Sequence, residues 1–292
     1  MIMNEKFFLA ALGGATGLGN KSIASLVNFF GNAKAVWTAD VADLHNVKIR
    51  KNSLKAFINF RDNNPDAPEK LIEYCDRHNI NVCSFFDEDY PPLLKEIDSP
   101  PIFFYYRGQL QPFAKRIAIV GSRNNTAYGQ DVAIDFAEQF AAAGLTVVSG
   151  AARGIDSFAH QGALKTGRTV AVLGCGLACK LSREREQLIA QIVDEGGAVI
   201  SEFNLQVTPT QGTLVARNRI IAGLCRGLVV VEASEKSGAL IAADCAKNYG
   251  RFVFAVPGSI RSDLSAGCNN LIRDGAVLVT SANDILNGND YV

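Results

Sequence analysis

Three residue types that suit phosphate follow one another directly after the apolar run RIAIV: Gly121, Ser122 and Arg123. Glycine allows a close approach to the backbone, a hydroxyl donates a hydrogen bond, and a guanidinium can hold a phosphate with two parallel N–H groups. The run GLTVV is likewise followed by the turn SGAARGIDSFAH, which restarts as a helix. Such turns present free N–H groups to an anion, so the residues predict anion binding and leave open which anion.

The ends of the other apolar runs carry the same kinds of residue. These runs end in glycines, hydroxyl-bearing residues and acidic residues, and cationic residues lie in the loops close by. Together these residue types predict a phosphate-binding rim, by which we mean the loops at the carboxyl ends of the runs. The loop residues that complete this rim are Ser149, Gly150, Arg153, Arg217, Arg219, Lys236 and Ser237.

The elements that position this rim are apolar strands alternating with helices. The predicted strands are RIAIVG, GLTVVSG, TVAVLG, GAVISEF, GLVVVEA, RFVFAVPG and GAVLVTS. Strands that are almost wholly apolar and separated by helices indicate a parallel sheet covered on both faces. The fold class we expect is α/β, a doubly wound and mainly parallel sheet, whose ligands bind at the carboxyl ends of its strands.

The chain divides into four regions by its patterns. Residues 1–65 have a helical period and a Gly-x-Gly turn at residues 17–19, and NNPDAP forms a turn-rich boundary. Residues 66–112 are rich in aromatics and prolines and predict an extended β-edge segment leading into the core. Residues 113–286 form the predicted sheet domain, and residues 287–292 form a tail. The phosphate-facing turns all follow Lys115, so the N-terminal region is expected to be dispensable for the main site.

Composition places the chain among soluble globular proteins. Its 292 residues are 48% hydrophobic, and its 29 basic and 29 acidic residues give no net charge. No run reaches transmembrane length and no signal-peptide pattern is present, so we expect a cytoplasmic protein with no membrane partner. The seven cysteines, with Cys175 and Cys179 four apart, show neither a disulfide framework nor metal-ligand spacing, so no metal is expected.

A dinucleotide is the first candidate ligand, since it is common on this fold. It requires G-x-G-x-x-G after the first strand. The turn here is GSRNNTAYG, and the best match elsewhere, GCGLAC, has Cys179 in place of the third glycine. We therefore favour no cofactor.

A nucleotide-cleaving enzyme is the second candidate. Glu202, Glu232, Asp156 and His160 could supply acid–base groups. Asp156 is placed to cap a helix and His160 to pack within it, and the two glutamates could orient neighbouring arginines as easily as carry out chemistry. Because no nucleophile, base and orienter occur together, no catalytic residue is assigned. A polymer phosphate, the third candidate, needs cations on several loops, and this sequence supplies them.

The motifs in order resemble one family, the DNA-processing protein A (DprA/Smf) family. They are GSR, SGAARGIDSFAHQGAL, AVLGCG, RNRIIAGL, VVVEASEKSGALIAADCA, RFVFAVPG and GCNNLIRDGA, and they cover most of residues 69–280. The resemblance implies an extended Rossmann-like domain preceded by a small helix-hairpin-helix or SAM-like domain. It further implies a protein without catalytic activity that binds single-stranded DNA regardless of sequence. Such a protein protects incoming DNA in natural transformation, loads RecA recombinase and forms a homodimer through the Rossmann-like domain.

Carrying the motifs over residue by residue gives the full set of expected DNA-binding positions. They are Gly121, Ser122, Arg123, Ser149, Gly150, Arg153, Gly154, Arg217, Asn218, Arg219, Lys236, Ser237 and Gly238. The sequence departs from the family pattern after its G-x-G, where Ala178, Leu181 and Ser182 stand for an aspartate and a Tyr-Pro pair. It departs again before RNR, where Leu214 and Val215 replace Phe-Pro. Many members also carry a C-terminal winged-helix-like domain, and because this sequence ends at Val292, soon after its last predicted strand, we expect that domain to be either missing or not included.

Overall fold

The computed structural model describes residues 2–288 and residue 291, and within them nine strands form a single sheet. Along the sheet the strand order is β1-β2-β6-β5-β4-β3-β7-β8-β9. The bounds are β1 Asn81–Ser84, β2 Phe103–Gly108, β3 Arg116–Val120, β4 Thr146–Ser149, β5 Thr169–Val172, β6 Ala198–Ser201, β7 Gly227–Val230, β8 Phe252–Ala255 and β9 Val277–Leu278. The pairs from β6 to β9 are parallel, whereas β1–β2 and β2–β6 are antiparallel. The predicted doubly wound, mainly parallel α/β fold is confirmed.

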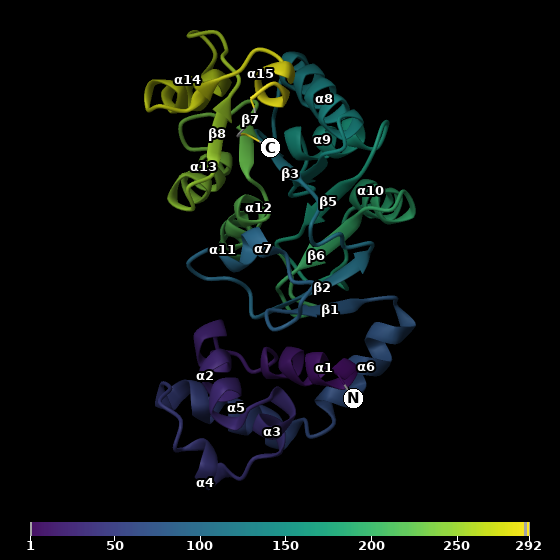
Figure 1. The fold of residues 1–292 in the computed structure, drawn as a ribbon, viewed down its shortest axis with the longest axis vertical. Coiled ribbons are helices and arrows are strands. Elements are labelled where there is room, and N and C mark those ends of the chain that lie inside the picture. The colour runs from purple at the N-terminus through teal and green to yellow at the C-terminus, as the bar shows by residue number, and fades with distance from the viewer. Residues whose placement is uncertain (1, 289–290, 292) are drawn as a thin grey trace.

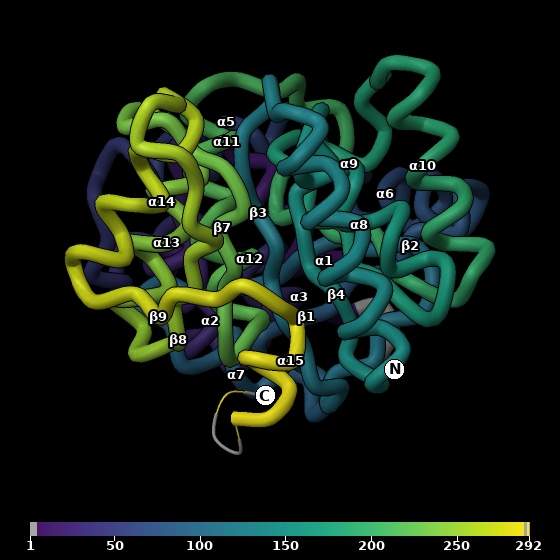
Figure 2. Tube along the Cα trace, turned by 90° about the horizontal axis from the view of Figure 1, so that it is seen from above, coloured from purple at the N-terminus to yellow at the C-terminus, as the bar shows by residue number. Residues whose placement is uncertain are grey.

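Helices cover both faces of the sheet (Figure 2). Alternate strand residues face two different cores: Ile117 and Ile119 of β3 pack with α8 and α9, whereas Ala118 and Val120 pack with α12 and α13. The helices of this part are α7 Pro92–Lys95, α8 Ala127–Ala142, α9 Ile155–Ala163, α10 Arg183–Asp194, α11 Gln211–Ala216, α12 Asn218–Gly223, α13 Gly238–Asn248, α14 Asp263–Arg273 and α15 Asn283–Leu286. None of the helices in the described residues is both long and apolar enough to cross a membrane.

The first region is helical, as its period predicts, and it lies at one end of the molecule beside β1 (Figure 1). Its helices are α1 Ile2–Leu12, α2 Asn20–Phe30, α3 Ala33–Thr38, α4 Val41–Leu44 and α5 Lys51–Asn63. The turn at residues 17–19 leads into α2, for which Gly19 is the N-cap.

The prediction of an extended segment was wrong at its beginning, because α6 spans Ala67–Arg77. Pro68 lies in the first turn of α6, where its missing N–H group costs nothing. Leu71 and the buried Cys75 then follow at helical spacing. Prolines later in the segment do disfavour a long helix, and there the chain forms the short β1, α7 and β2.

The N-terminal helices share a core with the sheet. Core residues of α1 and α2 belong to the same buried cluster as Phe103 and Tyr105 of β2. The amide of Asn204 donates to the carbonyl of Gly13 at 3.0 Å, and the Lys6 ammonium pairs with the Asp87 carboxylate at 2.7 Å. A boundary near residue 65 therefore crosses extensive apolar packing.

At the C-terminal end, α15 ends at Leu286, where the predicted domain also ends. Half of the predicted tail, residues 289, 290 and 292, lies outside the described residues. Tyr291 packs its ring against Phe252 and Phe254 of β8, at centroid distances of 4.8 and 5.1 Å.

Candidate nucleic-acid interface

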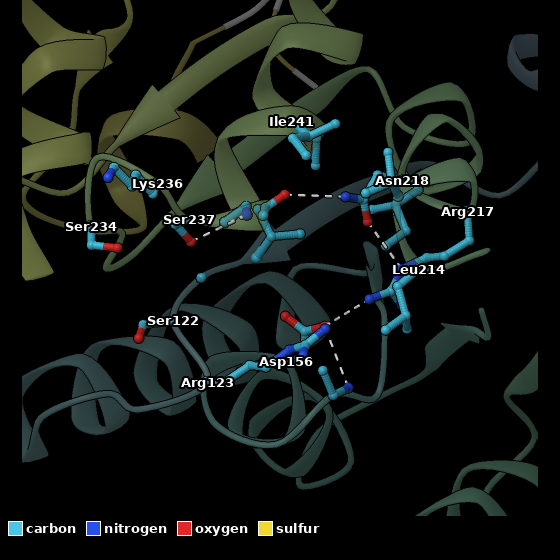
Figure 3. A pocket seen from close by; sticks show the side chains of 18 of the residues that line it. Ser122, Arg123, Asp156, Leu214, Arg217, Asn218, Ser234, Lys236, Ser237 and Ile241 are labelled. Atoms are coloured by element: carbon cyan, nitrogen blue, oxygen red, sulfur yellow. Dashed lines mark hydrogen bonds and ion pairs between the residues drawn. The ribbon is translucent and has the colours of Figure 1, made fainter. Parts of the chain in front are cut away.

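A cavity of about 660 Å³ lies at the carboxyl ends of β3 and β7. After β3 the chain adds β4, β5 and β6 on one side of β3, and it later returns to add β7, β8 and β9 on the other side. The cavity therefore lies at the point where the strand order reverses. In open α/β sheets the ligand crevice lies at that point. Figure 3 shows labelled side chains around it from the turn after β3, from α9, from the junction of α11 and α12, and from the loop after β7 together with α13.

The turn after β3 is packed tightly at its glycine and open at its arginine. A Cβ atom on Gly121 would lie 2.7 Å from the side chain of Ile155, so only glycine fits without displacement. The hydroxyl oxygen of Ser122 lines the cavity and accepts the N–H of Asn124 at 3.1 Å. Arg123 is exposed and lines the cavity, which leaves its guanidinium accessible to a ligand.

Glu232 holds this turn in place. Its carboxylate accepts hydrogen bonds from the N–H and the hydroxyl of Thr126, at 2.9 and 2.7 Å. Its backbone carbonyl accepts the N–H of Ser122 at 2.7 Å. Glu232 is only 3% exposed, and its partners are backbone and hydroxyl groups, not an arginine. Its position fixes both ends of the turn that carries Arg123.

Arg217 is buried and serves the protein's own structure. Its guanidinium donates to the carbonyl of Val172 at 2.6 Å and to the side chain of Asn218 at 3.0 Å, and lies 3.7 Å from the Asp156 carboxylate. Burial lowers the pKa of Arg217 and raises that of Asp156, and in each case the opposite charge of the partner opposes the shift. Arg217 therefore joins β5, α9 and α12, and together with Asn218 and Asp156 it forms part of the lining of the cavity.

The loop after β7 supplies the second exposed cation, Lys236, and the start of α13. The hydroxyl of Ser237 caps this helix by accepting the N–H of Ala239 at 3.3 Å. Gly238 lines the cavity, and a Cβ atom there would meet nothing within 4 Å. Gly238 does not have a positive φ, so neither packing nor backbone geometry requires glycine at this position.

Three other expected rim residues shape the backbone without lining the cavity. The hydroxyl of Ser149 donates to the carbonyl of Ile119 at 2.6 Å inside the sheet. Gly150 leaves room for a buried guanidinium, that of Arg217. Gly154 has a φ of 89°, which disfavours other residues, and its missing side chain lets the chain pass close to the carbonyl of Ser122.

The two remaining expected arginines are engaged elsewhere. Arg153 is exposed, and its guanidinium donates to the carbonyl of Arg123 at 3.3 Å and to the side chain of Asn124. It thus braces the turn that carries Arg123. Arg219 is paired with Glu202, as the orienting role considered for that glutamate predicts, and it does not line the cavity.

Asp156 and His160 of α9 are both buried and contact other groups of the protein. The N-cap position of α9 belongs to Gly154, so the prediction that Asp156 caps the helix was wrong. His160 is completely buried, as expected for a packing residue, and its Nδ1 atom lies 2.6 Å from the Thr169 hydroxyl oxygen. Because that hydroxyl donates to the carbonyl of Val147 at 2.7 Å, Nδ1–H is the donor to Thr169. Burial lowers the pKa of His160 to about 3 and keeps the ring neutral.

The GCG loop after β5 is closed to a pyrophosphate. The N–H of Gly176 donates to the carbonyl of Val207 at 2.9 Å, and the N–H of Ala178 to that of Leu205 at 2.8 Å. A Cβ atom on Gly176 would overlap the carbonyls of residues 204 and 205. These glycines therefore allow close packing of two loops, which explains a G-x-G without a dinucleotide.

The departures from the family pattern fall at two cavities. Leu214 and Val215 form part of the wall of the cavity at the switch point. Ala178 and Leu181 line a second cavity of about 700 Å³ between α6, α10 and the end of β2, and Ser182 is the N-cap of α10.

Sequence reasoning missed four polar residues near the first cavity. Asn124, Gln211 and Ser234 line it. Arg185 of α10 donates to the carbonyl of Ala151 at 2.5 Å and is close enough to Arg217 to lower its pKa. Asn124 and Ser234 lie in the motif loops themselves, next to residues that were chosen, and Gln211 and Arg185 lie outside the motifs; in neither case did residue type and spacing distinguish them.

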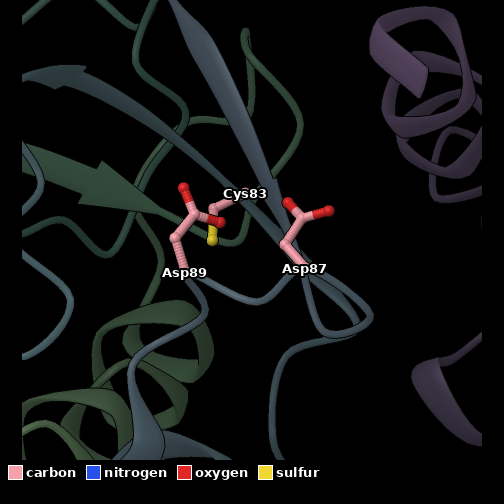
Figure 4. A group of neighbouring side chains, drawn as sticks. All are labelled: Cys83, Asp87 and Asp89. Atoms are coloured by element: carbon pink, nitrogen blue, oxygen red, sulfur yellow. The ribbon is translucent and has the colours of Figure 1, made fainter. Parts of the chain in front are cut away.

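Cys83, Asp87 and Asp89 gather near the end of β1 (Figure 4). The carboxylate of Asp87 is already paired with Lys6 and accepts the N–H of Ser84 at 2.8 Å. Burial, reinforced by the two aspartates, raises the pKa of the Cys83 thiol and favours its protonated form. This cluster connects α1 to the sheet and provides no argument for a metal.

The sheet and its switch-point cavity define a Rossmann-like α/β protein with a helical N-terminal region. A family model described as DNA recombination-mediator protein A matches residues 81–290, and the chain belongs to that family. Protein Smf of Escherichia coli (strain K12) is 38% identical over 259 residues, which cover 86% of this chain and 68% of that protein. The DNA processing protein DprA of Streptococcus pneumoniae is 42% identical over 205 residues, or 70% of this chain and 72% of the relative.

Two solved structures support the same assignment. The X-ray structure of DNA processing protein A from Streptococcus pneumoniae matches with a TM-score of 0.83 and 33% identity, covering 97% of each chain. DNA processing protein A from Helicobacter pylori, whose structural description concerns its single-stranded DNA binding mode, matches with a TM-score of 0.64 and 26% identity. The match covers 71% of this chain and 94% of that one.

Proposed function

We propose that this protein binds single-stranded DNA, independently of sequence, in the cavity at the switch point. The observation that carries the proposal is the placement of two exposed cations, Arg123 and Lys236, on separate loops that line one cavity beside the start of α13. A guanidinium, an ammonium and helix N–H groups on different loops suit successive phosphates of a strand. The single-stranded DNA binding mode described for the Helicobacter pylori protein supports this choice of ligand.

Sequence independence is consistent with the rest of the wall. Leu214, Val215 and Ile241 give it an aliphatic side, which can contact the face of any base. Aliphatic groups do not read hydrogen-bond patterns on base edges, so the affinity rests on the phosphates.

The resemblance extends the proposal to the cellular role. We infer that the protein protects incoming DNA in transformation and recombination, and loads RecA recombinase onto it. We also infer a cytoplasmic homodimer that forms through the Rossmann-like domain. The names of the Streptococcus pneumoniae and Bacillus subtilis relatives, DNA processing protein DprA, support the role in DNA processing.

The alternative is a nucleotide-processing enzyme on the same fold. Against it, Glu202 is paired with Arg219, Glu232 holds Thr126, and neither glutamate lines the cavity. Glu202→Gln and Glu232→Gln should leave oligo-dT affinity within a few-fold, because glutamine keeps the shape and much of the hydrogen-bond reach. Turnover of a nucleotide by the wild type that either substitution abolishes would favour the enzyme.

The test of the binding proposal is Arg123→Ala, with Arg168→Ala as the matched control. Both arginines are exposed, but Arg168 lies beside the start of β5, at the opposite edge of the sheet. Losing a phosphate ligand should weaken oligo-dT binding by about 1.5–3 kcal/mol, the range for hydrogen bonds to charged groups. The slope of log affinity against log salt should become shallower by roughly 0.7, one phosphate's share for a single strand.

The melting temperature of Arg123→Ala should remain close to that of the wild type, because the Arg123 side chain is exposed at the cavity and is not part of the core. Arg168→Ala should leave affinity and salt slope unchanged. Equal affinity and equal slope for Arg123→Ala and the wild type would show that DNA does not follow this cavity.

A further inference from the structure

The second cavity contains an arginine that the protein leaves without a partner. Arg107, near the end of β2, is half-buried and lines this cavity of about 700 Å³. Its Nε atom is shielded from solvent, and within the described residues its guanidinium has neither a hydrogen bond nor an ion pair. Three other arginines have an unpaired buried nitrogen, but each donates through another nitrogen; they are Arg116, Arg219 and Arg251. A shielded, unpaired guanidinium favours a ligand with a phosphate or carboxylate.

Two further charged groups of this cavity are available to a ligand. Lys180 follows β5, Asp194 ends α10, and both side chains are exposed and without a partner in the described part of the chain. The other carboxylate of the lining, Glu186, already accepts the N–H of Leu181 at 3.2 Å. A second cation beside the guanidinium favours phosphate. The free carboxylate can accept a hydrogen bond from a hydroxyl group, and water weakens its repulsion of an anion.

The walls of the cavity suit a flat ring. Tyr74 and His78 of α6 and its C-cap are stacked, with ring centroids 4.0 Å apart and planes at 16°. The Nδ1 atom of His78 lies 2.8 Å from the carbonyl oxygen of Tyr74, which holds the two rings together. The neighbouring α10 supplies the aliphatic side chains of Ile189 and Val193 (Figures 1 and 2). Rings on one helix and aliphatic groups on the other can enclose a planar, largely apolar group.

We propose that the second cavity binds a nucleoside monophosphate. Arg107 and Lys180 hold the phosphate, Asp194 accepts a hydrogen bond from a sugar hydroxyl, and the base lies between α6 and α10. The volume is in the usual range for small-molecule sites. A fatty carboxylate would leave the free carboxylate unused, and inorganic phosphate would leave both apolar walls uncovered. The site is separate from the cavity at the switch point, so it does not depend on DNA binding there.

Ala178 keeps this cavity free of one more negative charge. It lines the same cavity as Arg107, at the position where the family pattern has an aspartate. A carboxylate there would compete for the guanidinium and repel a phosphate. Because the family pattern has that residue, we expect Ala178→Asp to fold. Ala178→Asn adds nearly the same volume without the charge and is its matched control.

The experiment titrates the full chain with AMP by isothermal titration calorimetry, with adenosine, inorganic phosphate and octanoate as comparison ligands. Arg107→Gln removes the charge and keeps most of the side-chain length, and it should weaken AMP binding roughly ten- to a hundredfold, the range for hydrogen bonds to a charged group. Arg168→Ala, which replaces an exposed arginine outside this cavity, should bind AMP as the wild type does. Ala178→Asp should bind AMP about tenfold more weakly than Ala178→Asn.

AMP should bind more tightly than each comparison ligand. Absence of saturable AMP binding by the wild type would overturn the proposal, as would equal affinity of the wild type and Arg107→Gln. If Arg107→Gln does not fold, the pair at position 178 decides, and equal affinity of its two members counts against the site. Octanoate or inorganic phosphate bound as tightly as AMP would exclude a nucleotide as the ligand. Weaker AMP binding in Arg123→Ala with normal binding in Arg107→Gln would place the nucleotide in the cavity at the switch point instead.

Discussion

The guanidinium of Arg217 lies where a side chain at Gly150 would begin. A Cβ atom at position 150 would overlap the guanidinium carbon and nitrogens of Arg217. The guanidinium cannot move aside easily, because it donates a hydrogen bond to the carbonyl of Val172 and pairs with the carboxylate of Asp156. This relationship makes Gly150 a requirement of the buried ion pair. It also gives a physical reason why Gly150 and Arg217, which are far apart in the sequence, both occur in motifs that resemble the family.

Gly150→Ala should therefore lower the free energy of unfolding by about 3 kcal/mol or more, since displacing Arg217 leaves a buried carboxylate without its partner. Urea unfolding measures this loss. Gly212→Ala is the control, because a Cβ atom there meets only the hydroxyl oxygen of Thr210 at 3.7 Å. The control should stay within about 1 kcal/mol of the wild type. Equal stability of the two alanine variants would contradict the assigned role of Arg217.

His160 should make stability depend on pH in a defined direction. Its pKa is about 3 in the folded state and about 6.5 when unfolded, so between those values the unfolded chain binds more protons. The contribution is fully present above pH 6.5 and is lost as the pH falls below it. From pH 7.5 to pH 5 this group alone should cost about 2 kcal/mol of stability.

The measurement is urea unfolding of the wild type and His160→Gln at both pH values. Asp156 and Glu202 have raised pKa values and act in the opposite direction, so the difference between the two proteins isolates the histidine. The wild type should lose more stability than the variant on acidification. The same pH response in both proteins would show that His160 does not remain neutral in the folded state.

Sequence patterns predicted the parallel sheet well because its strands are short and almost wholly apolar. Both the length of these runs and their lack of polar alternation are typical of strands buried on two faces. They predicted the cavity only in part. The position of Arg123 follows from one turn after one strand, and it lines the cavity as expected. Arg217 and Arg219 look the same as Arg123 in the sequence, yet one is buried with Asp156 and the other is paired with Glu202. Only the three-dimensional positions of the acidic partners distinguish these arginines.

The boundary near residue 65 illustrates a different limit. Composition and turns mark the linker, but they carry no information about the apolar surface on each side of it. Phe103 and Tyr105 are 5% and 1% exposed because they pack in one core with the N-terminal helices. A turn-rich linker in the sequence therefore does not show that the regions on its two sides fold independently.

Removal of residues 1–67 should accordingly destabilise the rest of the chain, although the cavity lies elsewhere. Uncovering a large apolar side chain costs about 1.5–3 kcal/mol, and several would be uncovered together. The truncated chain should melt at a lower temperature, bind a hydrophobic dye and elute as aggregates. A monodisperse truncated chain with full oligo-dT affinity would instead support an independent N-terminal domain and the expectation that it is dispensable.

Gly238 provides a test of the cavity that involves no loss of charge. A side chain there meets nothing within 4 Å in the protein, and the residue begins α13, where alanine is a better helix former than glycine. Gly238→Ala should therefore leave the melting temperature unchanged or raise it slightly. Because Gly238 lines the cavity, the added methyl group enters the space that we propose for the DNA backbone.

A phosphate held against the start of α13 would have to move away from that methyl group, and hydrogen bonds to a charged group weaken steeply with distance. We expect oligo-dT affinity to fall about tenfold, which corresponds to about 1.4 kcal/mol. Fluorescence anisotropy with labelled oligo-dT measures this change, and Gly212→Ala again serves as the control, since Gly212 does not line the cavity. If Gly238→Ala binds as tightly as the wild type while Arg123→Ala binds weakly, the strand passes the turn after β3 but not the start of α13.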